Sequence, residues 1–257
     1  MFLQKFAKFL TLASLAICVG AFGESSLEQI KKGGVIRIAT EGTYSPYSFH
    51  DEKNELVGYD VDVAKAVAAK LGVEVRFVEA PWDAMLAAFN AGKADVVFNQ
   101  VSITPERKVK YDYSEPYTTA YGALIVRKDN DSIKKFEDLK GKNSAHSATS
   151  NWAQVAEKYG ANVVTVDGFS KGVELIIARR ADATINDTIT FFDFVKQKPD
   201  APIKIAATAS EPIYSAALFH KGSDTLVKAV NKALQELKAE GKLKEISMKY
   251  FGKDVSE

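Results

Sequence analysis

Alternating strand-like and helix-like segments constrain the fold of this chain more than any other feature of its sequence. Apolar or alternating runs at 35–39, 73–77 and 94–98 are typical of strands, and helical patterns occupy the intervals between them. Asp60 is expected to cap the first of these helices and Gly72 to end it. The order βαβαβ is typical of a sheet with helices packed against it, so the sequence predicts an α/β fold.

A second set of the same kind follows a long apolar run at 120–126. We expect this run to cross between two lobes, and a short strand at 214–219 to cross back. The other predicted elements are strands at 144–146, 163–166, 181–185 and 203–206, and helices at 150–159, 172–179, 188–196, 224–240 and 243–250.

Polar residues follow one strand of each set. Asn99-Gln100 and Asn186-Asp187 each come after an Ala-x-x-Ala-Asp segment and an apolar strand, which is either a faint internal repeat or a common helix–turn–strand pattern. In α/β folds the carboxyl ends of strands border the ligand crevice. The first segment leads to Arg107, whose guanidinium suits a carboxylate, and Asp187 suits a cation. The pair predicts a site for a small zwitterion.

Residues 1–23 have the pattern of a secretory signal peptide. Two lysines precede an apolar run at 9–19, which is too short to span a membrane comfortably, and a small-x-small cleavage pattern ends at Gly23. We expect cleavage after Gly23 and an exported, soluble mature chain. Cys18 is an alternative point of lipid attachment, although its surroundings fit that motif poorly.

Composition argues against several functions. The formal net charge is +1, and removal of the two leader lysines makes it −1, so neither nucleic acid nor an anionic membrane is an expected partner. The mature chain contains no cysteine and therefore no disulfide. No two histidines stand at ligand spacing, so we expect neither a metal nor another cofactor, and His146 is expected to be structural or to lie at a pocket rim.

Four segments, in this order, resemble those of the solute-binding proteins of bacterial ABC importers for polar amino acids (family 3), over essentially the whole mature sequence. They are Ile38-Ala39-Thr40-Glu41-Gly42-Thr43-Tyr44-Ser45-Pro46-Tyr47, Val57-Gly58-Tyr59-Asp60-Val61-Asp62, Ser102-Ile103-Thr104-Pro105-Glu106-Arg107 and Ala181-Asp182-Ala183-Thr184-Ile185-Asn186-Asp187.

This resemblance implies the two-lobe type II periplasmic binding protein fold, with two hinge-crossing strands and a ligand cleft between the lobes. Residues 24–118 and 218–257 would form lobe 1, and residues 119–217, with the hinge strands, would form lobe 2. It also implies a monomeric, non-enzymatic receptor in the periplasm that delivers a free amino acid to an ABC membrane permease.

The resemblance further implies roles for individual residues. Arg107 would bind the α-carboxylate of the ligand and Asp187 its α-ammonium. Tyr44 and Trp82 would flank the ligand side chain, and Glu41 would meet its polar group. The other predicted ligand-binding residues, which assist at the carboxylate or line the cleft, are Ser102, Gln100, Ser150, Thr149, Asn99 and Asn151.

Further segments resemble cystine-binding members in particular: Tyr47-Ser48-Phe49-His50-Asp51, Asn99-Gln100-Val101, Thr149-Ser150-Asn151, Val166-Asp167-Gly168-Phe169, Thr184-Ile185-Asn186-Asp187 and, away from the expected site, Lys196-Gln197-Lys198-Pro199-Asp200-Ala201-Pro202. L-Cystine is therefore the expected ligand, and Glu41 would meet its second ammonium group. Another polar or neutral amino acid, such as glutamine or cysteine, is the alternative.

An enzymatic alternative exists because some periplasmic dehydratases of prephenate-like acids share this fold. Such an enzyme needs a general acid in the cleft, for which Glu41 and His146 are the candidates. Unless its substrate is an amino acid, it needs no ammonium partner such as Asp187. A sensor domain is a third class, and no membrane segment follows the predicted lobes to support it.

Overall fold

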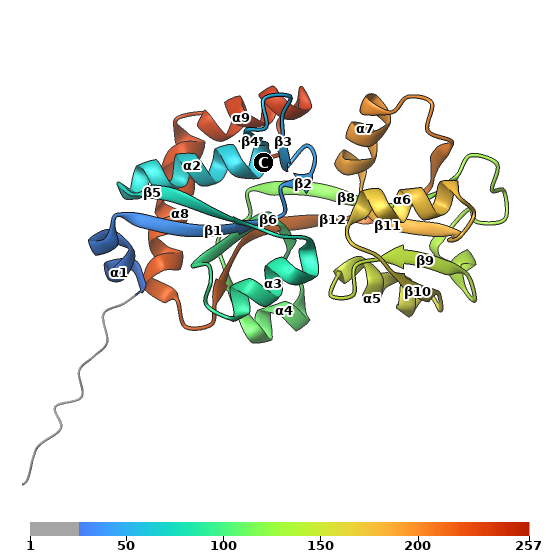
Figure 1. Ribbon diagram of the computed structural model, residues 1–257, viewed down its shortest axis with the longest axis horizontal. Coiled ribbons are helices and arrows are strands. Elements are labelled where there is room, and N and C mark those ends of the chain that lie inside the picture. Colours follow the sequence, from blue (N-terminus) through green and yellow to red (C-terminus); the bar gives the residue numbers. More distant parts are fainter. Residues whose placement is uncertain (1–25, 257) are drawn as a thin grey trace, which may run out of the picture.

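Two bodies joined by two long strands make up the protein (Figure 1). The computed structural model describes residues 26–256, so the predicted signal peptide and Cys18 lie outside the described residues. One mixed sheet runs through both bodies in the order β10-β9-β11-β8-β12-β6-β1-β5. Within the described range, no helix combines the length and the apolar character needed to cross a membrane.

The first body is a sheet with helices on both faces, and three of its strands are parallel. Its strands β1 (Val35–Thr40), β5 (Glu74–Glu79) and β6 (Val96–Ser102) pair in parallel. Side chains alternate between the faces of a strand, so Val96 and Phe98 pack against α2 and α8 while Val97 packs against α3. The helices are α2 (Tyr59–Leu71), α3 (Trp82–Asn90), α8 (Asp224–Ala239) and α9 (Lys242–Phe251).

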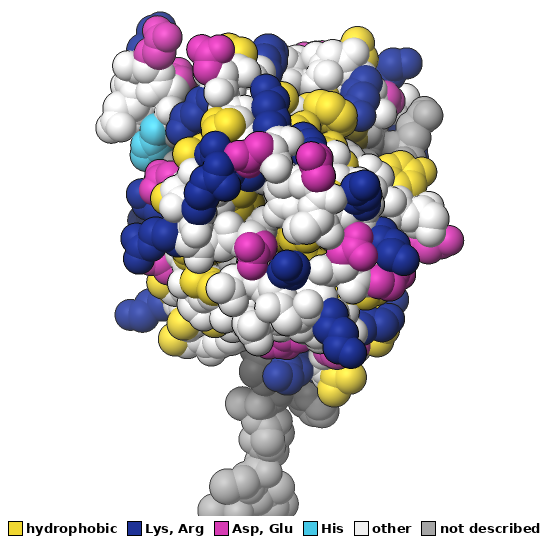
Figure 2. Space-filling model, turned by 90° about the vertical axis from the view of Figure 1, so that its right-hand side faces the viewer, with side chains coloured by type: hydrophobic (Ala, Val, Ile, Leu, Met, Phe, Trp, Pro, Cys, Tyr) yellow, Lys and Arg dark blue, Asp and Glu magenta, His cyan; other side chains and the backbone are white. Residues whose placement is uncertain are grey.

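The second body repeats this arrangement with different strands and helices. Its strands are β9 (Asn143–His146), β10 (Asn162–Thr165) and β11 (Ala183–Asp187), and its helices are α5 (Asn151–Lys158), α6 (Phe169–Ile177) and α7 (Thr188–Gln197). Apolar side chains of α6 and α7 form one core cluster and those of α5 contribute to another. Figure 2 shows the molecule from the side of this body, where acidic and basic side chains are interspersed.

Strands β8 (Thr118–Arg127) and β12 (Ile203–His220) connect the bodies. They pair antiparallel from Ile203 opposite Arg127 to Ser215 opposite Thr118, with register shifts on the way, and β12 then continues along β6. The prediction of separate strands at 203–206 and 214–219 is wrong, because both are parts of the single strand β12. The polar residues of the irregular stretch around Pro212 hide the strand pattern.

Short elements complete the chain, and the sequence analysis did not predict them. They are α1 (Ser26–Gly33), β2 (Thr43–Tyr44), β3 (Ser48–His50), β4 (Leu56–Val57), α4 (Pro105–Lys110), β7 (Tyr111–Tyr113) and a 3₁₀ helix at Phe136–Leu139. Thr104 begins α4: its hydroxyl accepts a hydrogen bond from the backbone N–H of Arg107, 3.2 Å away.

Two local predictions are wrong. Asp60 does not cap α2, because Gly58 occupies the N-cap position and the Asp60 side chain instead accepts a hydrogen bond from Gln100 at 2.7 Å. The strand predicted at 94–98 continues to Ser102, because the polar side chains of Asn99 and Gln100 find buried partners. Hydropathy alone does not reveal such partners.

Gly58 is a position where a side chain does not fit. Its φ is 134°, and a Cβ would lie 2.2 Å from the backbone oxygen of Tyr47. We expect Gly58→Ala to lower the free energy of unfolding by about 2–4 kcal/mol in urea denaturation. The control Gly33→Ala, with no neighbouring atom within 4 Å, should change it by less than about 1 kcal/mol. Equal losses in the two variants would contradict this account.

Candidate functional site

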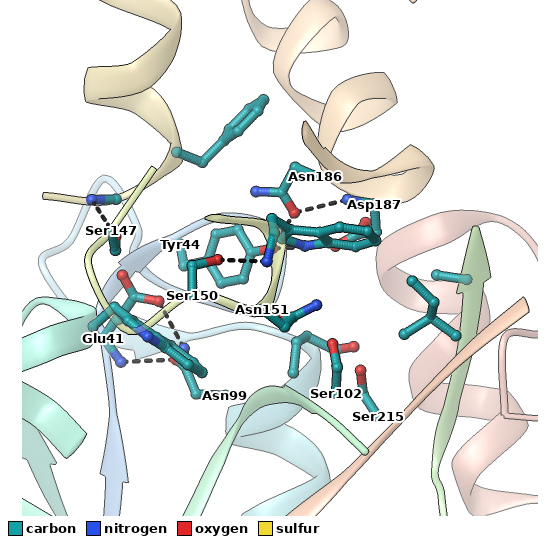
Figure 3. Close-up of a pocket in the computed structure, with 17 residues that line it drawn as sticks. Glu41, Tyr44, Asn99, Ser102, Ser147, Ser150, Asn151, Asn186, Asp187 and Ser215 are labelled. Atoms are coloured by element: carbon teal, nitrogen blue, oxygen red, sulfur yellow. Dashed lines mark hydrogen bonds between the residues drawn. The ribbon is translucent and has the colours of Figure 1, made fainter. Parts of the chain in front are cut away.

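A pocket lies between the two bodies, and both crossing strands contribute to its lining (Figure 3). The first body supplies residues that follow β1, that begin α3 and that end β6, while the second body supplies the turns before α5, α6 and α7. The lining residues are Glu41, Tyr44, Trp82, Asn99, Gln100, Ser102, Ala120, Ser147, Ser150, Asn151, Trp152, Gly168, Phe169, Asn186, Asp187, Ile213 and Ser215.

Nearly all residues predicted to bind a ligand line this pocket, with Arg107 and Thr149 as the exceptions. Residues from the two halves of the sequence therefore meet, as the predicted crevice between strand ends requires. The lining residues that sequence reasoning missed are Ala120, Ser147, Trp152, Gly168, Phe169, Asn186, Ile213 and Ser215. Asn186 and Gly168-Phe169 did stand in segments that carried the family resemblance, and this was the signal available for them.

Asn99 organises the wall that the first body contributes. Its side-chain oxygen accepts hydrogen bonds from the hydroxyls of Thr40 and Ser48 and from the backbone N–H of Glu41, at 2.9–3.2 Å. Its side-chain nitrogen donates to Glu41 Oε2 at 2.7 Å. Burial raises the pKa of the Glu41 carboxyl to about 7, although the hydrogen bond from Asn99 opposes this rise.

Asp187 is the buried carboxylate that the second body contributes. It caps α7, since Oδ1 accepts the backbone N–H of Thr190 at 2.8 Å. The hydroxyl of Tyr47 also donates to Oδ1, at 3.0 Å, and the hydroxyl of Thr190 donates to Oδ2, at 2.9 Å. Burial raises the pKa of Asp187, and these hydrogen bonds oppose the rise.

Tyr44 brings a third hydroxyl to the same carboxylate. Its oxygen lies 2.9 Å from Asn186 Oδ1, 3.1 Å from Asp187 Oδ2 and 3.0 Å from Thr190 Oγ1. A phenol has a single proton, so Tyr44 can donate to only one of these three acceptors at a time. The carboxylate can therefore lose this bond without leaving the tyrosine unpaired.

The side chain of Gln100 belongs to a buried polar cluster in the first body. Its side-chain nitrogen donates to Asp60 Oδ1 at 2.7 Å and to Thr118 Oγ1 at 3.1 Å. Its φ is 49°, in the left-handed region that few residues other than glycine adopt. The side-chain nitrogen of Gln100 is therefore engaged within the first body, although the residue also lines the pocket.

Arg107 lies at the edge of the pocket, where its guanidinium bridges the two bodies. It donates to the backbone oxygens of Ser102 and Thr149, both at 3.2 Å, and to Asn151 Oδ1 at 3.3 Å. The indole of Trp82 lies 5.2 Å from its guanidinium carbon. These hydrogen bonds are long for a charged donor, so none of them matches a bidentate bond to a carboxylate.

The turn before α5 is the part of the second body that Arg107 contacts. Ser150 caps this helix through its hydroxyl, which accepts the backbone N–H of Trp152 at 3.2 Å. The positive end of a helix dipole and the N–H groups of its first turn favour a negative group. Together with the guanidinium of Arg107, this turn can bind a carboxylate, whereas Glu41 and Asp187 offer negative charge further inside.

His146 is buried in the second body and lies outside the pocket lining. Its Nε2 is 2.8 Å from the hydroxyl of Ser144, and burial lowers its pKa to about 4. This agrees with the predicted structural role. Among residues 26–256, no group of three or more His, Cys, Asp or Glu side chains lies close enough together to hold a metal ion.

The raised pKa of Glu41 makes stability depend on pH. A folded pKa of about 7 exceeds the ordinary value of 4.5, so the folded state holds the proton more tightly and loses stability as pH rises from about 4.5 through 7. Glu41→Gln cannot lose this proton. We expect the variant to gain up to about 3 kcal/mol relative to the natural chain between pH 5 and pH 8, measured by urea denaturation. A pH-independent difference would contradict the assignment.

Comparison with known proteins identifies the family. The sequence profile of the bacterial extracellular solute-binding proteins, family 3, matches residues 36–253. The chain is 41% identical over 253 residues to a probable amino-acid ABC transporter-binding protein of Haemophilus influenzae, which covers 96% of this chain and 98% of that protein.

Two solved structures show the same fold. The L-cystine solute receptor of Neisseria gonorrhoeae, in its unliganded open conformation, is 43% identical and covers 91% of this chain and 100% of its own, with a TM-score of 0.59. An ancestral arginine-binding protein bound to arginine is 40% identical and covers 85% of this chain and 99% of its own, with a TM-score of 0.79. The two-lobe type II fold predicted from the sequence is thereby confirmed, and the chain belongs to the bacterial extracellular solute-binding proteins of family 3.

Proposed function

We propose that this protein is an extracytoplasmic receptor that binds L-cystine between its lobes and delivers it to the permease of an ABC importer. The observation that carries the proposal is a pocket between the lobes into which each lobe contributes one buried carboxylate, Glu41 from the first and Asp187 from the second. Cystine has two ammonium groups, and a buried ammonium needs a charged partner. The cystine receptor of Neisseria gonorrhoeae supports this choice of ligand.

Arg107 is the proposed partner of one α-carboxylate. Its three present acceptors are neutral oxygens at 3.2–3.3 Å, which a carboxylate can replace with shorter, charge-assisted bonds. Ser102 lines the pocket next to this guanidinium, and Ser150 lies at the start of α5 on the opposing side. Contacts to both lobes give the ligand a differential affinity for the closed form, which is the condition for ligand-driven closure.

Asp187 is the proposed partner of the neighbouring α-ammonium. When Tyr44 donates its proton to Asn186 Oδ1, Oδ2 of Asp187 keeps a free lone pair that can accept an ammonium hydrogen. Gln100, which the first lobe contributes, also lines the pocket.

Glu41 is the proposed partner of the second ammonium. Its carboxylate is oriented by Asn99, and Gly168 of the second lobe lies close to its other oxygen, Oε1. Tyr44, Trp82 and Phe169 supply apolar surface for the ligand side chain. A buried carboxylate also suits the guanidinium of arginine, and the arginine-bound relative makes arginine the second candidate.

We propose lobe boundaries at 118/119 and 217/218 and a monomer in solution. Strand β8 begins at Thr118 and β12 ends at His220, so these boundaries assign most of both crossing strands to the second lobe. The signal peptide at residues 1–23 belongs to the same proposal, since the family works outside the cytoplasm.

A thermal-shift panel of all amino acids and cystine tests the proposed function. We expect cystine to raise the melting temperature of the mature protein, since a ligand that binds only the folded state stabilises it. Arg107→Ala should abolish the shift and leave the melting temperature of the free protein nearly unchanged, while the neighbouring control Lys108→Ala should keep the shift. If no amino acid changes the melting temperature and the protein turns over prephenate, the proposed receptor function is wrong.

The role of Glu41 predicts a ligand-dependent loss of affinity. Glu41→Gln removes the charge that faces the second ammonium, so we expect about tenfold or more weaker binding of cystine and arginine in calorimetry. A ligand with one ammonium group, such as glutamine, should lose much less affinity. A uniform loss for all ligands would mean that Glu41 supports the fold of the pocket and does not select the ligand.

A further inference from the structure

One edge of the cleft holds direct hydrogen bonds between the lobes. Asp83, in the first turn of α3, accepts three of them from a turn of the second lobe. Its Oδ2 accepts the backbone N–H of Ala148 at 2.9 Å. Its Oδ1 accepts both the backbone N–H of Thr149, at 2.9 Å, and the hydroxyl of Thr149, at 2.5 Å. All hydrogen bonds of this carboxylate within the described residues thus cross from one lobe to the other.

Two neighbours of Asp83 reach the same turn. The indole N–H of Trp82 donates to the Thr149 hydroxyl at 2.9 Å, and Arg107 donates to the Thr149 backbone oxygen at 3.2 Å. Thr149 therefore bonds to three residues of the first lobe. Because neither Asp83, Ala148 nor Thr149 lines the pocket, these bonds form beside the ligand site and not within it.

The geometry points to a new role for Asp83: we propose that Asp83 and the turn Ala148-Thr149, here called the latch, set the affinity of the site without touching the ligand. The latch can form only when the lobes are close together, so it stabilises the closed form alone. The inference rests on the proposed function in so far as a ligand binds between closing lobes.

A latch of this kind affects every ligand alike. The apparent dissociation constant is the intrinsic one divided by the fraction of molecules in the binding-competent form, and the latch changes only that fraction. A residue that touches the ligand changes the intrinsic dissociation constant, and it does so by a factor that differs between ligands. The latch also breaks when the lobes open, so its loss should accelerate dissociation. Thr149, predicted from the sequence as a ligand-binding residue, acts in this proposal on the closure of the lobes.

Asp83→Ala and Thr149→Val test the proposal. Each should weaken the binding of cystine and of arginine by the same factor, about tenfold for Asp83→Ala, mainly through faster dissociation in stopped-flow or surface-plasmon measurements. The double variant should lose less than the product of the two single losses, because both remove the same bond. The matched control is Asp95→Asn, whose carboxylate accepts from Arg37 within the first lobe and should leave binding unchanged.

A second measurement needs no ligand. The mature chain has no cysteine, so Lys110→Cys and Lys158→Cys place one spectroscopic label on each lobe. Asp83→Ala should lower the population with a short distance between the labels in the free protein, and Asp95→Asn should not. If no amino acid binds, the proposed function fails while this distance still reports on the latch. Unchanged distances, or affinity losses that differ between ligands, would overturn the latch.

Discussion

The antiparallel pairing of β8 with β12 is the constraint on which the rest of the structure depends. These strands join two α/β units into one sheet, because β8 also pairs with β11 of the second unit and β12 also pairs with β6 of the first. The loops at the strand ends of the two units therefore face each other across the pair. The irregular register between Thr208 and Pro212 lies between the two well-paired regions, where a change of angle disturbs the fewest ladder hydrogen bonds.

Burial of charge shapes the cleft between the units. Glu41 and Asp187 are both nearly inaccessible, which raises their pKa values, and the protein offsets part of that cost with hydrogen bonds from Asn99 and from a group of hydroxyls. The polar groups are thus already oriented before a ligand arrives. A binding site of this kind gains affinity because little side-chain ordering remains to be done on binding.

Local sequence patterns predicted much of the fold. The alternation of strand and helix segments predicted nearly every long element, because such patterns depend on neighbouring residues only. The predictions failed where a partner far away in the sequence determines what a residue or segment does. Asp60 has the sequence of a helix cap, yet its partner is Gln100, and β12 contains a polar stretch that only its pairing with β8 holds in the sheet.

The sequence by itself determined the α/β alternation, the polar strand ends and the family, since these depend on residue types at short spacing. It also singled out most of the residues that line the pocket. Only the tertiary structure decided how the two halves meet: that Thr149 bonds to Asp83 at the edge of the cleft, that the Gln100 amide points into a buried cluster, and that Phe169 and Ile213 complete the pocket. Such contacts join residues far apart in the chain, and for those between the two bodies the crossing of β8 and β12 brings the partners together.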